Sequence, residues 1–222
     1  MAWLVTVSWI SIVLSVGQAI IIAADTARRP QKMMPIMNLV WPLIGLFYPI
    51  SGIWTYYAIG RATHRSTSSQ HGQGRPRWQG VLVSTTHCSS GCALGDMIGA
   101  PLVFATGLLI AGSALLTDYI VEFVLAYIFG IAFQYFGMGL TKHESPIRAL
   151  TDAIKADTLS LISFEVGMFG WMALVSLVFF ASAPEPTTPV FWFMMQIAML
   201  LGFVTSYPAN WILVSKGVKH AM

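Results

Sequence analysis

The stretch at residues 86–97, THCSSGCALGDM, gathers the side chains of this sequence that are best suited to bind a metal ion. It holds His87, both cysteines of the sequence (Cys88 and Cys92) and the carboxylate of Asp96. Residues four apart share one face of a helix, so the two cysteines and the aspartate form a stripe, with the imidazole about 100° away around the axis. Two thiolates and an imidazole suit Cu(I) and, less well, Zn(II). The pattern predicts a soft-metal site at these four residues.

Two other interpretations of the cysteine pair stay open. A reversible disulfide between Cys88 and Cys92 would make the protein a membrane thiol-disulfide oxidoreductase, but disulfide geometry needs Cβ atoms ~3.8 Å apart, which a regular helix does not offer. The Ser-Ser-Gly sequence at 89–91 forms helix poorly, so a break there would relieve this constraint and let His87 turn inward. Cysteines also pack well between membrane helices, in which case the protein is a non-catalytic scaffold or subunit.

Further soft and polar side chains fall within apolar stretches. Glu165 is the most demanding, because a charge near the centre of an isolated membrane helix costs at least about 2.5 kcal/mol and needs a partner or water. Asp118 and Glu122 share one helix face near the outer end of their stretch, where solvation at the interface accounts for them. Thioethers bind Cu(I), and repeated methionines along a path suit its passage. The candidate contacts of a soft-metal or polar path are Met168, Met172, Met195, Met199, Glu165 and Gln196.

The composition indicates a multi-pass membrane protein. Of 222 residues, 56% are hydrophobic and 9% charged, against about 25% charged in soluble domains, and the mean hydropathy is +0.69. Spans of about 20 residues and short connections use up this length, so we expect one integral membrane domain, 1–222. The net charge of +3 sits in the loops and gives no basis for nucleic-acid binding. The expected partners are the lipid bilayer and a metal ion, with room for a homo-oligomer.

The apolar stretches predict an all-α membrane protein, a polytopic bundle of about six transmembrane helices. The second stretch, 35–59, has proline every seven residues, so we expect it to be kinked or re-entrant. A flexible loop is predicted at 61–80, and a loop that contains a short amphipathic helix at 141–157. No phosphate-binding loop, metalloprotease motif or serine-hydrolase motif occurs, so the sequence favours a protein that is not an enzyme. The expected spans are 3–24, 35–59, 81–116, 118–140, 158–181 and 190–214.

Basic residues orient the spans, because cytoplasmic loops carry an excess of Lys and Arg. Lys216 and Lys219 place the C-terminus in the cytoplasm, and the loops 61–80 and 141–157 fall on the same side. The basic cluster at 28–32 agrees with this orientation only if the second stretch is re-entrant. In either arrangement the cysteine motif lies near the cytoplasmic face, where thiols stay reduced.

Four segments of the sequence are distinctive: HCSSGCALGDM, KADTLSLISFEVGMFGWM, FWFMMQIAML and SYPANWILVSKGVKHAM. Together they resemble the bacterial integral-membrane proteins grouped as domain of unknown function family 4396, and the resemblance covers most of the chain from the second span onward. It implies an all-helical domain in the bacterial inner membrane, with no established activity. The family pattern has Gly-Ala in place of Ser89-Ser90 and more often Gln in place of Glu165, which implies that a carboxylate is not essential at that position.

Overall fold

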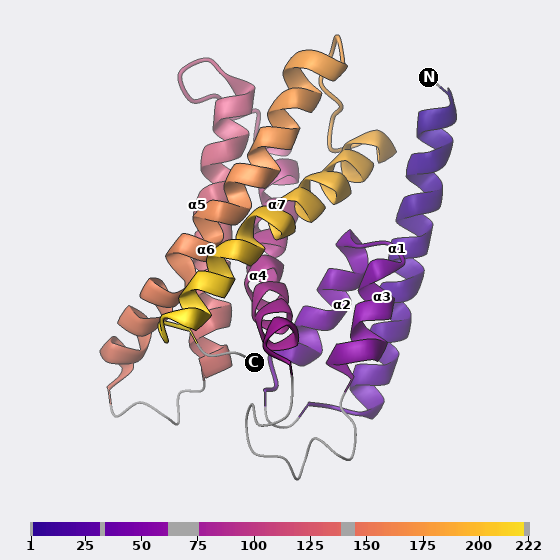
Figure 1. Ribbon diagram of the computed structural model, residues 1–222. Coiled ribbons are helices and arrows are strands. Elements are labelled where there is room, and N and C mark those ends of the chain that lie inside the picture. Colours follow the sequence, from indigo (N-terminus) through magenta and orange to yellow (C-terminus); the bar gives the residue numbers. More distant parts are fainter. Residues whose placement is uncertain (1, 32–33, 62–75, 139–144, 220–222) are drawn as a thin grey trace.

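The computed structural model is an all-α bundle, with no β-strand in the part of the chain that it describes. It describes residues 2–31, 34–61, 76–138 and 145–219. The helices are α1 (Ala2–Arg28), α2 (Met37–Phe47), α3 (Ser51–Thr55) with the π-helical turn η1 (Tyr56–Gly60), α4 (Arg77–Thr106), α5 (Ala114–Met138), α6 (Pro146–Leu174) with the π-helical turn η4 (Val175–Phe179), and α7 (Pro189–Ser215). Five of them, α1, α4, α5, α6 and α7, are long and apolar enough to cross a membrane (Figure 1). The predicted all-α membrane fold is confirmed, but these residues contain five candidate spans and not six.

The second apolar stretch folds as a hairpin instead of a sixth span. Helices α2 and α3 pack against each other and against one half of α1, and the chain reverses at Ile50, which has a φ of 67° (Figure 1). Both ends of the hairpin return to the same end of the bundle. The side chain of Gln31 donates to the carbonyl oxygen of Gly60 at 2.6 Å, and Arg61 pairs with Asp25 at 2.9 Å. The structure thus agrees with the re-entrant alternative.

Gln18 of α1 satisfies the backbone where the hairpin reverses. Its amide nitrogen donates to the carbonyl oxygens of Gly45 and Tyr48, the latter at 2.7 Å, and its oxygen accepts from the backbone N–H of Ile50 at 3.0 Å. Irregular backbone is tolerated at membrane depth only where protein or trapped water satisfies it. One buried glutamine therefore makes the sharp turn of the hairpin compatible with an apolar environment.

Helix α4 lies at the centre of the bundle and packs against α2, α5, α6 and α7 (Figure 1). Its glycines at 91, 95 and 99 recur every four residues and face α5. A Cβ atom at Gly95 would lie 2.3 Å from the backbone nitrogen of Ala126, and one at Gly91 would lie 2.7 Å from the Cα atom of Gly130. Small residues at this spacing allow membrane helices to approach closely. The cysteine motif is consequently enclosed on all sides, because nearly every residue from 80 to 96 is buried.

Two loops are shorter than predicted. Helix α6 begins at Pro146 and continues unbroken through the position where a separate amphipathic helix was expected, so that prediction is wrong. Proline suits the first turn of a helix, and the buried positions keep one helical period from the start of α6 into the span, at Ala153, Ala156, Asp157, Ser160, Leu161 and Phe164. Helix α4 likewise begins at Arg77, within the predicted loop 61–80. The remainder of the two loops, 62–75 and 139–144, lies outside the described residues.

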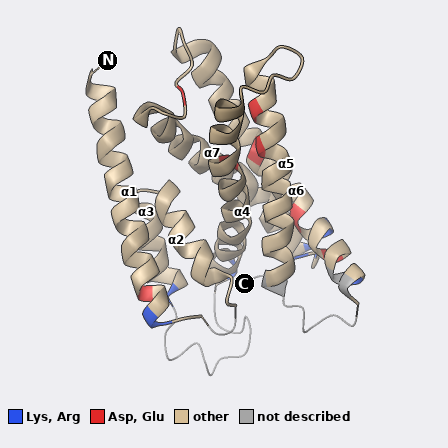
Figure 2. Ribbon diagram, turned by 180° about the vertical axis from the view of Figure 1, so that it is seen from behind, with Lys and Arg blue, Asp and Glu red and all other residues tan. Residues whose placement is uncertain are grey.

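The described basic residues lie in one half of the bundle, the half that contains the end of α7 (Figure 2). They belong to the end of α1, the end of η1, the start of α4, the first turns of α6 and the end of α7 with the turn that follows. Asp118 and Glu185 lie toward the opposite end. With five candidate spans and one hairpin among the described residues, the two termini lie toward opposite ends of the bundle (Figure 1).

Candidate functional site

Helix α4 is continuous through the cysteine motif. The hydroxyl groups of Ser89 and Ser90 donate to the carbonyl oxygens of Thr86 and His87, at 3.1 and 2.7 Å, so these poor helix formers are satisfied within the helix. Both cysteines are free. Residues four apart on a helix have Cβ atoms about 5–6 Å apart, which is too far for a disulfide. The helix break on which the oxidoreductase interpretation depended is absent.

His87 points away from the two thiols. Its Nε2 atom lies 3.1 Å from the carbonyl oxygen of Phe133 on α5, and its ring is fully buried. The thiol of Cys88 instead faces Asp157 on α6. Within the described ranges, no group of three or more His, Cys, Asp and Glu side chains is arranged to hold a metal ion. The structure therefore does not bring the four residues of the predicted metal site together.

The thiol of Cys88 belongs to a buried cluster that includes a cation. It donates to the carboxylate of Asp157, and the Lys219 ammonium lies 2.6 Å from the Cys88 sulfur. The same ammonium donates to Oδ1 of Asn210 at 2.9 Å and lies 3.8 Å from Oδ1 of Asp157. The Asn210 amide in turn donates to the hydroxyl of Ser160 at 2.6 Å. Lys219 is 2% exposed and Asp157 is 1% exposed, so this ion pair is shielded from solvent.

A turn after α7 brings Lys219 back to the bundle. Gly217 has a φ of 69°, in the left-handed region that favours glycine. The backbone N–H groups of Val218 and Lys219 then donate to the carbonyl oxygen of Leu213, at 3.0 and 3.3 Å. This is the hydrogen bonding expected of a glycine that ends a helix. In the sequence, Lys219 indicates only the orientation of the chain. The glycine two positions before it was the signal that the chain turns back.

Three carboxyl groups continue from this cluster along α4. Glu165 is a neighbour of the thiol of Cys92, and the carboxyl group of Asp96 lies within electrostatic range of those of Glu165 and Glu122. The side chain of Glu122 packs against Gly99, where a Cβ atom would lie 2.8 Å from its Cγ atom. All three carboxyl groups are buried. We call the whole set the polar row: Lys219, Asn210, Asp157, Cys88, Cys92, Glu165, Asp96 and Glu122.

The part of the polar row on α4 follows the axis of that helix. At 1.5 Å per residue, the stretch of α4 from Cys88 to Gly99 covers about 16 Å, or roughly half of the ~30 Å hydrocarbon core. Asp118 lies one helical turn beyond Glu122 toward the opposite end of the bundle, and it is half-buried. The row therefore starts in the basic half of the bundle and extends toward the other end, with Asp118 one turn beyond its last member.

Several oxygen atoms of the row have no hydrogen-bond partner among the described residues. They are both carboxyl oxygens of Asp96, both of Glu165, and Oδ2 of Asp157. An ionised carboxylate that is buried without a partner is very costly, so such a group is normally neutral or has a cation or water beside it. Aside from Lys219, the described structure supplies no positive charge to these groups.

The remaining predicted contacts divide between two places. All four of the predicted methionines are buried in the same apolar cluster as Cys92: Met168, Met172, Met195 and Met199. Gln196 does not face the polar row. Its oxygen accepts from the hydroxyl of Ser11 at 2.6 Å, and its nitrogen donates to the carbonyl oxygen of Leu46 at 3.0 Å. Gln196 thus joins α7 to α1 and to the hairpin.

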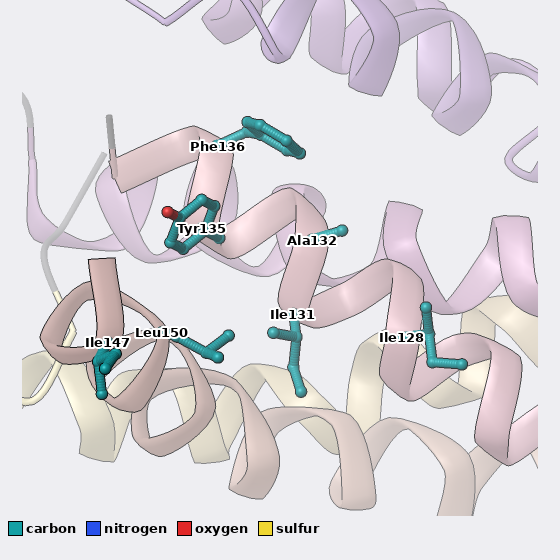
Figure 3. A pocket seen from close by; sticks show the side chains of 7 residues that line it. All are labelled: Ile128, Ile131, Ala132, Tyr135, Phe136, Ile147 and Leu150. Atoms are coloured by element: carbon teal, nitrogen blue, oxygen red, sulfur yellow. The ribbon is translucent and has the colours of Figure 1, made fainter. Parts of the chain in front are cut away.

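A groove on the outside of the bundle is separate from the polar row. It lies between the end of α5 and the start of α6, with Ile131 on one helix and Leu150 on the other (Figure 3). Apart from the hydroxyl group of Tyr135, the side chains that line it are aliphatic or phenyl groups. A surface of this kind suits lipid hydrocarbon and offers little to an ion.

Comparison with known proteins identifies a family. A family model described as Domain of unknown function (DUF4396) matches residues 77–219. No curated protein and no solved structure matches the chain. The matched range begins with α4 and ends at Lys219, so it contains every member of the polar row, whereas α1 and the hairpin lie before it.

Proposed function

The chain belongs to the family described as Domain of unknown function (DUF4396), and from the polar row within the matched range we propose that this multi-pass membrane protein carries a cation through its helical core. The observation that carries the proposal is the burial of Asp96, Glu165 and Asp157 with carboxyl oxygens that have no hydrogen-bond partner among the described residues. Ionisable groups inside a membrane domain are costly, and they commonly mark ion pathways and proton relays.

A proton is the cation that best suits the row. The carboxyl groups of Asp157, Glu165 and Asp96 all lie within electrostatic range of the Cys92 thiol, and the carboxyl group of Asp96 lies within range of those of Glu165 and Glu122. Carboxyl groups can pass protons through side chains and single water molecules, and the close packing of the row does not obstruct this. A hydrated metal ion would instead need an opening of its own size.

Cu(I) is the second candidate, and the sulfur atoms support it. The thiol of Cys92 lies in the same buried cluster as the thioethers of Met168 and Met199. Soft thiolate and thioether ligands select Cu(I). Zn(II) fits less well because its structural sites take four ligands. In this version of the metal hypothesis His87 and Asp96 are not ligands, and Cys92 is the residue on which binding depends.

We further propose that the basic end of the bundle faces the cytoplasm of a bacterial cell and that the inner membrane holds the protein. The distribution of Lys and Arg in Figure 2 supports this orientation through the positive-inside rule. The Lys219 cluster then lies at the cytoplasmic end of the polar row. Asp118 lies at the other end, toward the periplasm.

Proton movement is tested with the full-length protein reconstituted in liposomes that contain a pH-sensitive dye. A potassium diffusion potential should drive acidification in wild-type liposomes. Asp96→Asn should abolish it, because Asp96 faces the carboxyl groups on both sides of it. Glu165→Gln should keep part of the flux, and Asp152→Asn, a partly exposed position on α6 outside the row, should keep all of it. Wild-type flux equal to that of empty liposomes would refute the proton proposal.

Copper binding is tested separately by elemental analysis of protein purified in mild detergent after exposure to Cu(I). Wild type should retain copper through dialysis, Cys92→Ser should lose it, and His87→Ala should retain it because the imidazole faces α5. Equal copper content in wild type and Cys92→Ser would contradict the second candidate.

A further inference from the structure

The ammonium group of Lys219 is surrounded by side chains that are ordinary cation ligands. It donates to the sulfur of Cys88 at 2.6 Å and to the amide oxygen of Asn210 at 2.9 Å, with the carboxylate of Asp157 at 3.8 Å. The side chain is fully shielded from solvent. Asn210 is held in this orientation because its nitrogen donates to the hydroxyl of Ser160.

The ligands and the cation are attached to the fold in different ways. Cys88, Asp157 and Asn210 belong to α4, α6 and α7, three helices that pack against one another. Lys219 instead follows the helix, on a turn whose preceding residues 215–218 are exposed. Two backbone hydrogen bonds to Leu213 tie this turn to α7. The ligand set is therefore part of the rigid bundle, whereas the cation is delivered by a short surface segment.

The ligand set also keeps an acceptor that Lys219 does not use. Oδ2 of Asp157 is buried and has no partner among the described residues, and it rests against Gly130, where a Cβ atom would lie 2.6 Å away. Without the ammonium group, this carboxylate would be a buried charge with no counter-charge from Lys219, a destabilised state that uptake of a proton or of another cation relieves.

We propose that Cys88, Asp157 and Asn210 form a site for a small monovalent cation, that Lys219 occupies it as a tethered cation, and that a free cation replaces Lys219 when the turn after α7 moves away. Occupation by Lys219 closes the basic end of the polar row, and its departure opens that end. The cation site stands on the local geometry alone, and only its gating role rests on the proposed function.

Chemical rescue of the Lys219→Ala variant tests the site. Removing the ammonium group should lower the melting temperature of the full-length protein in detergent. Ethylammonium chloride should raise it again, because a ligand that binds the folded state stabilises it. Choline chloride at the same concentration serves as the control cation, since it has no N–H group to donate. Lys216→Ala, an exposed position on the same turn, is the matched variant and should respond to neither salt.

The double variant Lys219→Ala/Asp157→Asn separates the effect of the Asp157 charge from the effect of the space that the Lys219 side chain leaves. It carries no unpaired buried charge, so it should be more stable than the single variant and should gain nothing from ethylammonium. Equal stabilisation of the single and the double variant, or of the single variant by choline and ethylammonium, would overturn the site.

Thiol labelling covers the case in which Lys219→Ala is too unstable to purify. In a Cys92→Ala background, Cys88 is the only cysteine, and its reaction with N-ethylmaleimide can be followed by mass. In this background, the protein that also carries Lys219→Ala and Asp157→Asn should react at least about tenfold faster than the protein that keeps Lys219. A tenfold change is equivalent to ~1.4 kcal/mol. Equal rates would overturn the closure by Lys219. Rescue by ethylammonium without any proton flux in wild type would support the cation site and refute the proposed function. Proton flux in wild type without rescue by ethylammonium would refute the cation site and leave the proposed function standing.

Discussion

Cys88 and Cys92 lie one helical turn apart on α4 but have different neighbours. The thiol of Cys88 lies between the Asp157 carboxylate and the Lys219 ammonium. Cys92 lies beside Glu165 and the apolar cluster that contains the methionines. The two thiols therefore contact different members of the polar row, and a substitution of one cysteine leaves the partners of the other in place.

The buried ion pair gives a prediction at this scale. Asp157→Asn leaves the Lys219 ammonium without a counter-charge and should destabilise the protein by about 3 kcal/mol. Adding Lys219→Met should recover at least half of that loss. Unfolding in mixed detergent micelles measures both values, and Asp152→Asn should stay within about 0.5 kcal/mol of wild type because it lies outside the cluster. Additive losses in the double variant would show that the two charges do not interact.

The sequence predicted part of this chemistry. It singled out Cys88, Cys92 and Asp96 as candidate ligands and Glu165 as a costly charge in an apolar stretch, because composition and helical spacing are local properties. It grouped His87 with the cysteines, since adjacency in sequence does not show that the imidazole faces Phe133 on another helix. It did not connect Lys219 with Cys88, which lies 131 positions away. That contact depends on how α4 packs against α7, and no local pattern contains this information.

At the scale of elements, the hairpin of α2 and α3 depends on one side chain from outside it. Gln18 on α1 is hydrogen-bonded to the backbone of Gly45, Tyr48 and Ile50, where the chain reverses. Proline spacing predicted a kinked or re-entrant segment because prolines interrupt helical hydrogen bonds. It did not indicate which of the two forms occurs, since the choice depends on a partner that lies about 30 residues away.

Gln18→Leu should therefore destabilise the hairpin. It removes the partner of two buried carbonyl oxygens and of the part-buried N–H of Ile50, and a buried group left unsatisfied costs about 1–3 kcal/mol. We expect a total loss of at least about 2 kcal/mol, together with faster proteolysis between α1 and α4. Thr6→Val, at an exposed position of the same helix, should be nearly neutral. A Gln18→Leu protein with wild-type stability would mean that water satisfies the turn.

The contact of α4 with α5 leads to a second prediction about elements. Gly95→Val places side-chain atoms where the backbone of Ala126 lies, and backbone cannot move aside as a flexible side chain can. This variant should fail to assemble or should unfold at a much lower temperature, as measured by size-exclusion chromatography after heating. Gly170→Ala meets no atom within 4 Å, and it should be neutral or stabilise by about 0.5–1 kcal/mol through helix propensity. Similar losses in both variants would contradict this account of the packing.

At the scale of the whole molecule, the polar row and the distribution of basic residues share one axis. The described Lys and Arg residues lie in the half of the bundle where Lys219 contacts Cys88 (Figure 2). Acidic groups continue from that end toward Asp118. The sequence predicted the basic end from the loops, because the number of Lys and Arg residues in each loop does not depend on how many spans are assigned. The proposed cation path, with one end closed by Lys219, combines this axis with the Lys219 cluster.

Reporter fusions test this arrangement in living bacterial cells. A fluorescent protein that folds only in the cytoplasm should be fluorescent when fused after position 34, after position 61 or after position 219. Alkaline phosphatase, which is active only outside the cytoplasm, should be active when fused after position 110 or position 184. Positions 34 and 61 give the decisive comparison, because the hairpin begins and ends at the same face of the bundle. If they report opposite sides, the second apolar stretch crosses the membrane. The start of α1 would then lie on the same side of the membrane as the end of α7. The assignment of the Lys219 end of the polar row to the cytoplasmic side would have to be revised.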